Sequence, residues 1–398
     1  MHRVAVTGIG VMAAPGRTRA TFWESLREGR SAIRPMTLVN GLRFSNAAEV
    51  PEYCATEYLD PKEAGMLDRF TQFALIAARE AVADCGVTFT GERTAVVTGT
   101  SAGGKTCEDR EFESLYARNT GRVHPLTIPR TMANAATSRI ALEYGITGPS
   151  YTVSTACASA THAIGQAFWM VRHGQVDAAI AGGSEAPFSM GFLKAWEAMR
   201  IVAPDTCRPF SRDRKGLILG EGAAMLMLEP LERARARGAR IWGEIAGFGM
   251  SSDAHHLTQP LAGGAALAMR AALQDANVTP EAVGYVNAHG TGTLANDATE
   301  AQAIREVFGG RAEKVPVSST KSMHGHALGA AGALEAAATL LALHDGVLPP
   351  TANFTEADPE CGLDVIPNAA RAAAVEWALS NSFAFGGLNA VLVFRKAS

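Results

Sequence analysis

The chain has 398 residues, of which 47% are hydrophobic and 19% charged, with a net charge of −3, an ordinary globular composition. This length allows one large domain or two of roughly 150–200 residues. Because basic residues are not in excess, the composition argues against nucleic acid as a partner. The six cysteines are scattered without a CxxC pair, which favours free thiols in the cytoplasm over a disulfide framework.

The chain offers no good candidate for a membrane span or a secretory signal. The most hydrophobic stretch, Ala327–Leu343, is too short to cross a bilayer, is rich in alanine and glycine, and contains Glu335. We therefore expect a buried helix there. Met1–Gly10 has a short apolar run that alternates as a strand does, so it predicts a strand and not a signal peptide.

Short β-rich runs, most of them ending in glycine, alternate with segments of helical length. This alternation is typical of an α/β protein with largely parallel, buried strands. The predicted strands include 3–8, 94–99, 177–182, 284–289 and 390–394, and the predicted helices include 70–85 and 266–276.

The order of these elements repeats in the second half of the chain, which indicates a duplication. Two helices at equivalent places, Ala158–Arg172 and Ala327–His344, consist mostly of small residues and have little polar surface. Helices of this kind belong in an interior, so we expect the two to pack against each other. The result would be a layered sandwich of helices, sheet, central helices, sheet and helices, with halves at residues 1–239 and 240–398.

Cys157 lies in Ser154–Ala160, where a predicted strand enters a tight turn and a small-residue helix begins. A thiol at the positive end of a helix dipole is expected to have a lowered pKa. Backbone N–H groups at such a turn can bind an oxyanion. The alternative is a buried, inert cysteine, which is the usual interpretation of a free cysteine and the one that fits the other five.

Two histidines lie just past predicted strand ends, next to glycine. His289 follows the strand at 284–289, and His326 opens the second small-residue helix. A lone histidine here would more often be structural, but functional residues collect at such junctions. If the duplication is real, the N-termini of the two central helices converge and bring Cys157 and His326 together.

Three other motifs favour rival functions only weakly. His324–His326 and His255–His256 lack the spacing of a four-ligand zinc site, so we expect no metal. Gly8–Ala13 is similar to a dinucleotide-binding fingerprint, but the turn Ala14–Gly16 follows where a helix is required. Gly182–Ala186 lacks the last glycine of a hydrolase nucleophile elbow.

Taken together, the motifs resemble the elongating β-ketoacyl-acyl carrier protein synthases (synthase I/II type) of the thiolase superfamily. The resemblance covers essentially the whole chain and implies a thiolase-like duplicated five-layer α-β-α-β-α sandwich, with one thiolase-like half in each part. The Cys-His-His set matters most, because thiolases pair two cysteines with histidine and initiating synthases use Cys-His-Asn. The motifs that carry the resemblance are Val153–Cys157, Val286–Thr293, Ser318–His326 with Leu328–Gly332, and Ser380–Gly387.

Within this family the chain looks closest to the nodulation protein E type. Leu193–Arg200 and Ala203–Arg208 are similar to that type, as is His324, where most elongating synthases have threonine. Gly292 stands where fatty-acid enzymes usually carry serine, and the resulting His-Gly-Thr-Gly-Thr is similar to polyketide ketosynthases. Both fatty-acid-type and polyketide-type chemistry are therefore open.

The resemblance implies an acyltransferase with a ping-pong reaction. An acyl chain passes from the phosphopantetheine of an acyl carrier protein (ACP) to Cys157. Malonyl-ACP then loses CO2, and its enolate attacks the Cys157 thioester. His289 and His326 are implied to donate N–H to the enolate oxygen, so neither a metal nor a further cofactor is expected. The N–H groups of Cys157 and Phe385 would hold the acyl oxyanion.

Further roles follow from the same resemblance. Phe385 would gate access to the thiol, with Phe383 packed beside it. Ala384 replaces the glycine that usually precedes this gate, and its Cβ restricts the loop. Lys321 and Glu300 would orient His326 and the loop after His289. The remaining implied site residues are Asp297, which supports the site, and Ala102, Thr291 and Thr293, which belong to the substrate pocket.

The resemblance also implies partners. They are ACP with its acyl and malonyl loads, and a second copy of the chain in a homodimer. Ala102 is equally compatible with a pocket floor that admits a long acyl group and with packing at the dimer interface. Lys62 and Arg69 are candidates for a basic patch that binds acidic ACP. Two other functions remain open: the catalytic ketosynthase subunit of a type II polyketide system, and a non-catalytic partner subunit, against which the presence of the Cys-His-His set argues.

Overall fold

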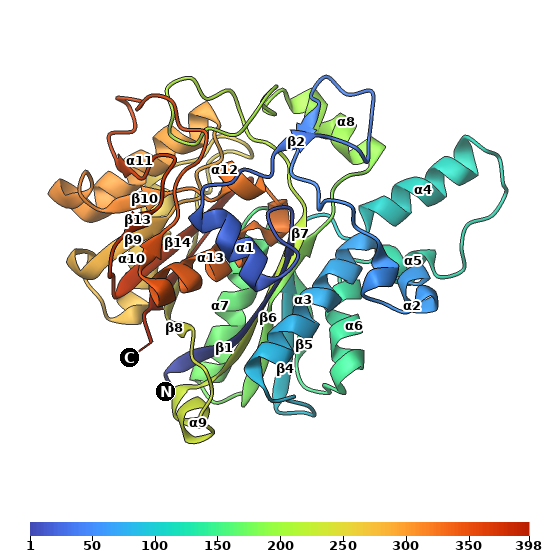
Figure 1. The fold of residues 1–398 in the computed structure, drawn as a ribbon, viewed down its shortest axis with the longest axis horizontal. Helices are drawn as coiled ribbons and strands as arrows, with labels where there is room; N and C mark the ends of the chain where they lie inside the picture. Colours follow the sequence, from blue (N-terminus) through green and yellow to red (C-terminus); the bar gives the residue numbers. More distant parts are fainter. Residues whose placement is uncertain (398) are drawn as a thin grey trace.

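The computed structural model describes residues 1–397, and its core is one mixed sheet of eleven strands (Figure 1). In spatial order the strands are β12 (Asp364–Val365), β10 (Pro316–Ser318), β9 (Val283–Asn287), β14 (Trp377–Ala384), β15 (Leu388–Arg395), β8 (Gly243–Ser252), β1 (Val4–Ala13), β7 (Gly222–Pro230), β6 (Ala178–Glu185), β4 (Thr94–Gly99) and β5 (Ser150–Val153).

The sheet is built from two half-sheets with the same strand arrangement. The order β5-β4-β6-β7-β1 in the first half corresponds to β10-β9-β14-β15-β8 in the second. The half-sheets join where Val4–Val6 of β1 pairs antiparallel with Gly243–Ile245 of β8. The predicted duplication is therefore present, with its two sheets fused edge to edge. A division of the chain between residues 239 and 240 stays a prediction.

The strands are less parallel than the sequence suggested. Pairings of β4 with β5 and β6, and of β9 with β10 and β14, are parallel, but β7, β1, β8 and β15 follow one another antiparallel. The sequence analysis missed β7 and β14. Because β14 and β15 are joined by only three residues, they can pair only as an antiparallel hairpin.

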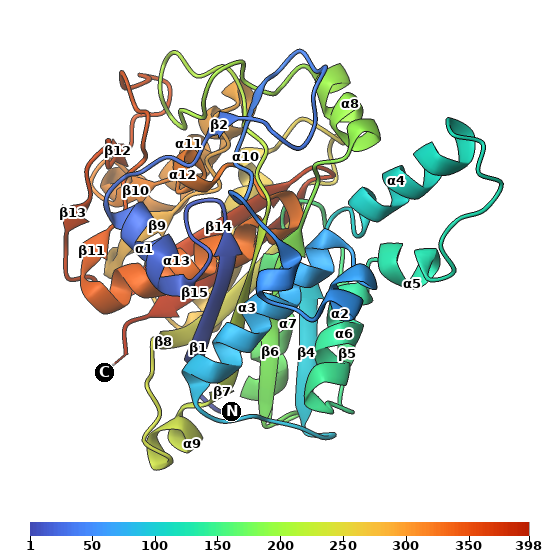
Figure 2. The same cartoon turned by 45° about the vertical axis from the view of Figure 1, so that its right-hand side comes forward.

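The two small-residue helices form the central layer, as predicted. α7 (Ser159–Arg172) and α13 (Ala331–Asp345) pack against each other, and each contacts strands of both half-sheets (Figure 2). Glycine makes this close approach possible, because a Cβ on Gly332 would lie 1.9 Å from the Thr161 hydroxyl oxygen. The predicted sandwich of helices, sheet, central helices, sheet and helices is confirmed.

Helices also cover the outer faces of the sheet. α3 (Arg69–Cys85) lies on β1, β7 and β6, and α6 (Ala135–Tyr144) packs beside it. On the other half, α10 (Ala262–Ala276) covers β8 and β15, and α11 (Leu294–Phe308) packs on α10. Gly8 and Gly10 of β1 let α3 approach, since a Cβ on either would come within 2.0 Å of a carbonyl oxygen of that helix. The glycines that imitated a dinucleotide fingerprint therefore serve helix packing.

The remaining elements lie at the periphery. α4 and α5 form an arm that projects from the body of the molecule, and α8 lies next to the base of this arm (Figures 1 and 2). The peripheral elements are α1 (Arg19–Arg27), α2 (Pro61–Gly65), α4 (Lys105–Tyr116), α5 (Thr127–Thr131), α8 (Met190–Met199), α9 (Leu231–Ala236), β2 (Arg34–Pro35), β3 (Asn46–Ala47), β11 (Val347–Leu348) and β13 (Arg371–Ala372). The short helix α12 (Lys321–His324) is instead completely buried.

Within residues 1–397, the helices are all too short or too polar to span a membrane. The hydrophobic stretch Ala327–Leu343 is fully buried in the central layer. The prediction of a buried helix at this place is confirmed.

Candidate active site

The turn that carries Cys157 is held by its own side chains. Ala156 has a φ of 49°, and α7 begins at Ser159, two residues after the cysteine. The Ser159 hydroxyl accepts a hydrogen bond from Thr155 N (2.9 Å) and donates to Ala156 O (2.6 Å). These hydrogen bonds stabilise a strained turn. Cys157 itself is only 7% exposed, just before the N-terminus of the central helix α7.

The thiol is more strongly affected by burial than by the helix. Burial raises the pKa of Cys157 to about 12, although the Lys321 charge and the Phe385 backbone N–H both lower it. The predicted lowering of this pKa by the helix dipole is therefore wrong. The physical reason is that the free-energy cost of removing a thiolate from water exceeds its stabilisation by the Lys321 charge and the Phe385 N–H.

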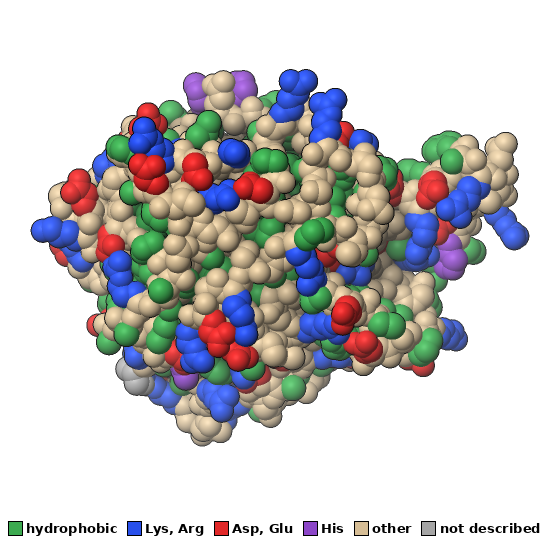
Figure 3. Space-filling model, turned by 45° about the horizontal axis from the view of Figure 1, so that its top comes forward, with side chains coloured by type: hydrophobic (Ala, Val, Ile, Leu, Met, Phe, Trp, Pro, Cys, Tyr) green, Lys and Arg blue, Asp and Glu red, His purple; other side chains and the backbone are tan. Residues whose placement is uncertain are grey.

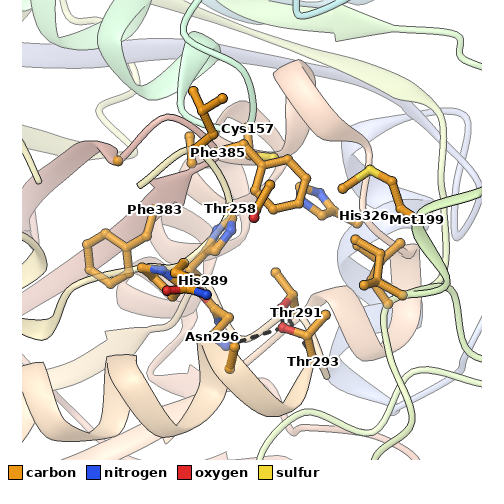
Figure 4. A pocket seen from close by; sticks show the side chains of 18 of the residues that line it. Cys157, Met199, Thr258, His289, Thr291, Thr293, Asn296, His326, Phe383 and Phe385 are labelled. Carbon is orange, nitrogen blue, oxygen red and sulfur yellow. Dashed lines mark hydrogen bonds between the residues drawn. The ribbon is translucent and has the colours of Figure 1, made fainter. Parts of the chain in front are cut away.

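Cys157 and the two predicted histidines meet at one point. The Cys157 sulfur and one ring nitrogen each of His289 and His326 lie within 4.8 Å of one another. The two imidazoles pack edge to face, with ring centroids 5.4 Å apart. His289 follows β9 and His326 precedes α13, so the predicted convergence of the two halves is confirmed (Figure 4).

Hydrogen bonds fix the tautomer of each histidine. Nδ1 of His326 accepts from Leu328 N (3.1 Å), and Nδ1 of His289 lies 3.2 Å from Lys321 Nζ, an ammonium that can only donate. Burial, followed by the Lys321 charge, lowers the pKa of both imidazoles well below 6.5, so both are neutral at neutral pH. A neutral imidazole whose Nδ1 accepts carries its proton on Nε2. Both rings are therefore N–H donors through Nε2.

The same three side chains have the composition of a metal site but the wrong hydrogen-bonding partners. A histidine that binds a metal through one nitrogen normally donates the other N–H to a carboxylate or carbonyl. Here the other nitrogens of His289 and His326 face donors instead. Metal binding through Nε2 would oppose both contacts, so the geometry suits proton donation rather than coordination.

Lys321 is fully buried and contacts His289. Its ammonium donates to His289 O (2.7 Å) and forms an ion pair with Glu335, a buried side chain of α13. Lys321 was expected to orient His326. Within the described residues its hydrogen bonds go to His289 and Glu335, so that expectation is wrong. The partner follows from the helical turn of α12, which carries Lys321 beneath the end of β9.

Glu335 was missed as a site residue. Burial raises its pKa to about 7, although Lys321 lowers it, and one of its carboxylate oxygens has no partner. In the sequence it was noted only as a charge that interrupts a hydrophobic stretch. The one acid within the apolar stretch Ala327–Leu343 was the available signal, because such a residue is rarely buried without a partner.

Glu300 and Asp297 hold the loop after His289. Glu300 accepts from His289 N (2.8 Å), Gly290 N (2.7 Å) and the Asn381 amide (3.1 Å). Asp297 accepts from Gly292 N (3.2 Å) and Phe210 N (2.8 Å). Burial raises the pKa of both carboxyls, that of Glu300 to about 7. The loop is thus fixed by carboxylates of α11.

Glu185, at the end of β6, was also missed. It accepts from Gly329 N (2.9 Å) in the turn before α13, and from Ser101 N (2.7 Å) and Ala102 N (3.1 Å) in the loop after β4. This buried carboxylate ties the two halves together beneath the site. The sequence analysis considered its motif only as a failed hydrolase elbow.

A cavity of about 280 Å³ opens in front of the Cys-His-His set. Thr291 and Thr293 line it on the side away from Cys157 (Figure 4), and Phe383 and Phe385 also line it. Ala102 is not among its lining residues. The lining residues that the sequence analysis did not select as site residues are Trp196, Met199, Ile201, Leu217, His256, Leu257, Thr258, Gln259, Pro260, Ala295, Asn296, Ala384 and Gly387.

Arg69 does not belong to a free basic patch. Its guanidinium forms an ion pair with the buried Glu221 (2.6 Å) and lies over the rings of Tyr53 and Phe73. The prediction that Arg69 serves as a surface cation is therefore wrong, because the carboxylate already neutralises it. Lys62, on the short helix α2, is exposed.

Two family models match the chain, and together they span most of it. One describes the beta-ketoacyl synthase N-terminal domain and matches residues 1–234, and the other describes the C-terminal domain and matches residues 242–355. The chain belongs to the beta-ketoacyl synthase family. It is therefore an acyltransferase, and the family resemblance found in the sequence is confirmed.

Several curated relatives of this beta-ketoacyl synthase match along its full length. Nodulation protein E of a Rhizobium sp. is 47% identical, with 99% of each chain covered. The 3-oxoacyl-[acyl-carrier-protein] synthase 2 of a Synechocystis sp. is 42% identical, with 99% of this chain and 98% of the relative covered.

Solved structures agree with this family. The ishigamide ketosynthase/chain length factor superposes with a TM-score of 0.95 at 40% identity, and a beta-ketoacyl synthase from Burkholderia phymatum with 0.91 at 36% identity, each with full coverage of both chains. The thiolase-like fold class inferred from the motifs is confirmed.

Proposed function

We propose that this beta-ketoacyl synthase condenses malonyl-ACP with an acyl chain carried on Cys157, and that CO2 is lost in the same half-reaction. The observation that carries the proposal is the pair of neutral imidazoles, each with its Nε2–H free to donate, beside a buried thiol. Two fixed N–H donors without a metal match the need to stabilise an enolate oxygen.

In the first half-reaction the acyl group moves to Cys157. The thioester bond to the phosphopantetheine sulfur breaks, a thioester to the cysteine sulfur forms, and the thiol proton ends on the released phosphopantetheine. Because the pKa of the free thiol is raised by burial, its proton leaves only as the transfer proceeds. The Phe385 N–H and the Cys157 N–H would hold the oxyanion.

In the second half-reaction malonyl-ACP loses CO2, and the electron pair of the broken bond forms the enolate. His289 and His326 would donate to the enolate oxygen. The enolate carbon then attacks the Cys157 thioester, and the cysteine leaves as thiolate and takes up a proton. Lys321 would act as a positioning residue, because its ammonium keeps Nδ1 of His289 an acceptor.

The other residues have supporting roles in the same proposal. Glu300 and Asp297 hold the His289 loop, and Thr291 and Thr293 line the path of the phosphopantetheine arm. Phe385 gates the thiol and Phe383 supports the gate. For Ala102, which is tied to Glu185 through its backbone N–H, both the floor of an acyl pocket and packing at the dimer interface remain part of the proposal.

The same proposal includes the partners. ACP is the expected carrier in the cytoplasm, and a second copy of the chain is expected at the free edge of β5. The arm of α4 and α5 projects from the body of the molecule (Figure 3), and the apolar side chains of Phe112, Tyr116 and Ile128 on it are exposed. Exposed apolar surface of this extent is typical of an interface.

A second candidate is the catalytic subunit of a type II polyketide system. It is favoured by Gly292 and by the similarity to a ketosynthase/chain length factor. In that case the partner at β5 would be a related chain that lacks the active cysteine.

An elongation assay tests the proposal. The purified enzyme is incubated with malonyl-ACP and acyl-ACPs of increasing chain length, and the products are read by mass spectrometry. One added two-carbon β-keto unit per turnover by the homodimer supports it. Failure with every acyl-ACP contradicts it, and repeated extension only after a cysteine-less partner chain is added favours the polyketide candidate.

A further inference from the structure

Phe385 lies at the tip of a very short hairpin. Ala384 is the last paired residue of β14 and faces Leu388 of β15, so only residues 385–387 form the loop. The two loop glycines have φ values of 83° and 70°, and Gly386 N donates to Leu257 O (2.8 Å). The loop is therefore tightly constrained, and the Phe385 N–H donates toward the Cys157 sulfur.

The Phe385 ring stacks on Trp196 of α8. The ring centroids are 6.1 Å apart and the planes differ by 24°. The indole is only 9% exposed, and its edge-on neighbour on the same helix is Phe192, with centroids 6.4 Å apart. An aromatic pair at this separation adds attraction beyond simple burial.

Trp196 also lies between two cavities. It lines the active-site cavity, and it lines a separate surface pocket of about 200 Å³ with Arg43, Phe44 and Arg200. The indole is thus the side chain that both cavities share. Phe385, on the side of the active-site cavity, has this indole behind its ring.

We propose that Trp196 is a positioning residue that holds the Phe385 ring in place beside Cys157 and so sets how often the thiol is open to an acyl thioester. This inference rests on the proposed function, in which Phe385 is the gate. The backbone before Phe385 is fixed, because Ala384 has a Cβ and is paired in β14. The Phe385 ring therefore has to move by side-chain rotation, and this rotation breaks the contact with Trp196. The stack therefore sets part of the cost of opening.

The test is the rate at which iodoacetamide alkylates Cys157, read by mass spectrometry of the peptide. Trp196→Leu removes the stack and should speed alkylation roughly two- to tenfold, the range expected for one aromatic pair. Trp196→Phe keeps a ring at this position and should stay near the wild-type rate. Trp196→Met fills the space with a flexible side chain and serves if leucine disturbs folding.

Two further variants distinguish a specific effect of the Trp196–Phe385 stack, called the latch below, from a general loosening of α8. Phe192→Leu removes the other ring partner of Trp196 and should change the alkylation rate less than about twofold. In a Phe385→Leu background, Trp196→Leu should have no additional effect, because the two residues act through one contact. Equal rates in wild type, Trp196→Leu and Trp196→Met overturn the inference, as does an undiminished effect of Trp196→Leu in the Phe385→Leu background.

Alkylation needs no condensation, so this result is independent of the elongation assay. A latch without elongation would contradict the proposed function alone. Elongation by wild type with no response to Trp196 would contradict the latch alone. In the elongating enzyme, Trp196→Leu should change the rate of the acyl-transfer half-reaction by a larger factor than the rate of malonyl decarboxylation, a split that a purely structural role would not produce.

Discussion

The two halves of the molecule share one arrangement of strands and helices but contribute different chemistry. At the start of α7 the first half presents Cys157, held by backbone and hydroxyl contacts. Before α13 the second half presents His326 and, beside it, His289, supported by the buried charges of Lys321 and Glu335. Cys157 is held by a turn without charged groups, whereas His289 is held by the Lys321–Glu335 ion pair and His326 by a backbone N–H.

This difference follows from what each group has to do. A thiol that forms and breaks a covalent bond needs access and nearby N–H groups. A histidine that donates a hydrogen bond needs a fixed tautomer, and only a partner with a defined proton can fix it. For His289 this partner is the Lys321 ammonium, and for His326 it is the backbone N–H of Leu328.

Cys157→Ala should have the largest effect, because it removes the covalent step from the first half. Elongation should fall by on the order of 10³-fold or more, while malonyl decarboxylation persists on the intact second half. Both rates are measured by mass spectrometry and CO2 release. Cys54→Ala, at an exposed thiol, is the matched control. Retained elongation would remove Cys157 from its assigned role.

His289→Ala and His326→Ala test the second half alone. Each removes one donor to the enolate oxygen, so decarboxylation should fall by roughly 10²–10³-fold. The assay is CO2 release from malonyl-ACP in the Cys157→Ala background, with exposed His255→Ala as control. Wild-type rates in both variants would mean that the imidazoles do not stabilise the enolate.

Lys321→Met tests whether the ionic network fixes the histidines. Burial and the Lys321 charge lower the pKa of His289, so the pH profile of its imidazole NMR signals at native Lys321 should stay flat from pH 7.5 to 6. The decarboxylation rate is a second readout, which also responds near pH 7, where Glu300 and Glu335 titrate. An ordinary histidine would be only roughly one quarter neutral at pH 6. Without the lysine charge the pKa of His289 rises, so its protonation and the accompanying loss of rate move to higher pH.

The control for this profile is Lys314→Met, which removes an exposed charge. Identical pH profiles for Lys321→Met and the native residue would show that the ammonium has no influence on the imidazole. A native profile with an inflection near pH 6.5 would contradict the neutral, shielded state of both histidines.

His324→Thr should have the smallest effect, on stability. Burial lowers the pKa of His324 to about 3, so between pH 7.5 and 5.5 the unfolded chain binds a proton there and the native chain does not. The contribution of His324 to the free energy of unfolding therefore falls as pH drops below 6.5. The variant should gain about 1.4 kcal/mol relative to wild type over this range, measured as free energies of unfolding in urea. His255→Thr, at an exposed histidine, is the matched control for the substitution itself.

The sequence predicted the fold, and it selected three side chains that the structure brings together, for specific reasons. Small-residue composition marked α7 and α13 as central helices, a tight turn before a small-residue helix marked Cys157, and glycine next to a strand end marked His289 and His326. It did not predict the directions of the strands, the direction of the pKa shift of Cys157 or the hydrogen-bond partner of Lys321. The parallel character of the sheet was overestimated, the pKa of Cys157 was expected to fall, and Lys321 was assigned to the wrong histidine.

Local patterns along the chain therefore indicated which residues to propose for the site and which helices are buried, because turn geometry and hydrophobic composition are encoded over a few neighbouring positions. Only the tertiary structure decided the rest. Depth of burial set the pKa values of Cys157 and both histidines, and the packing of α12 on α13 paired Lys321 with Glu335. The stack of Trp196 on Phe385 joins residues 189 positions apart (385 − 196). Desolvation and long-range contacts depend on the whole fold, which no local pattern specifies.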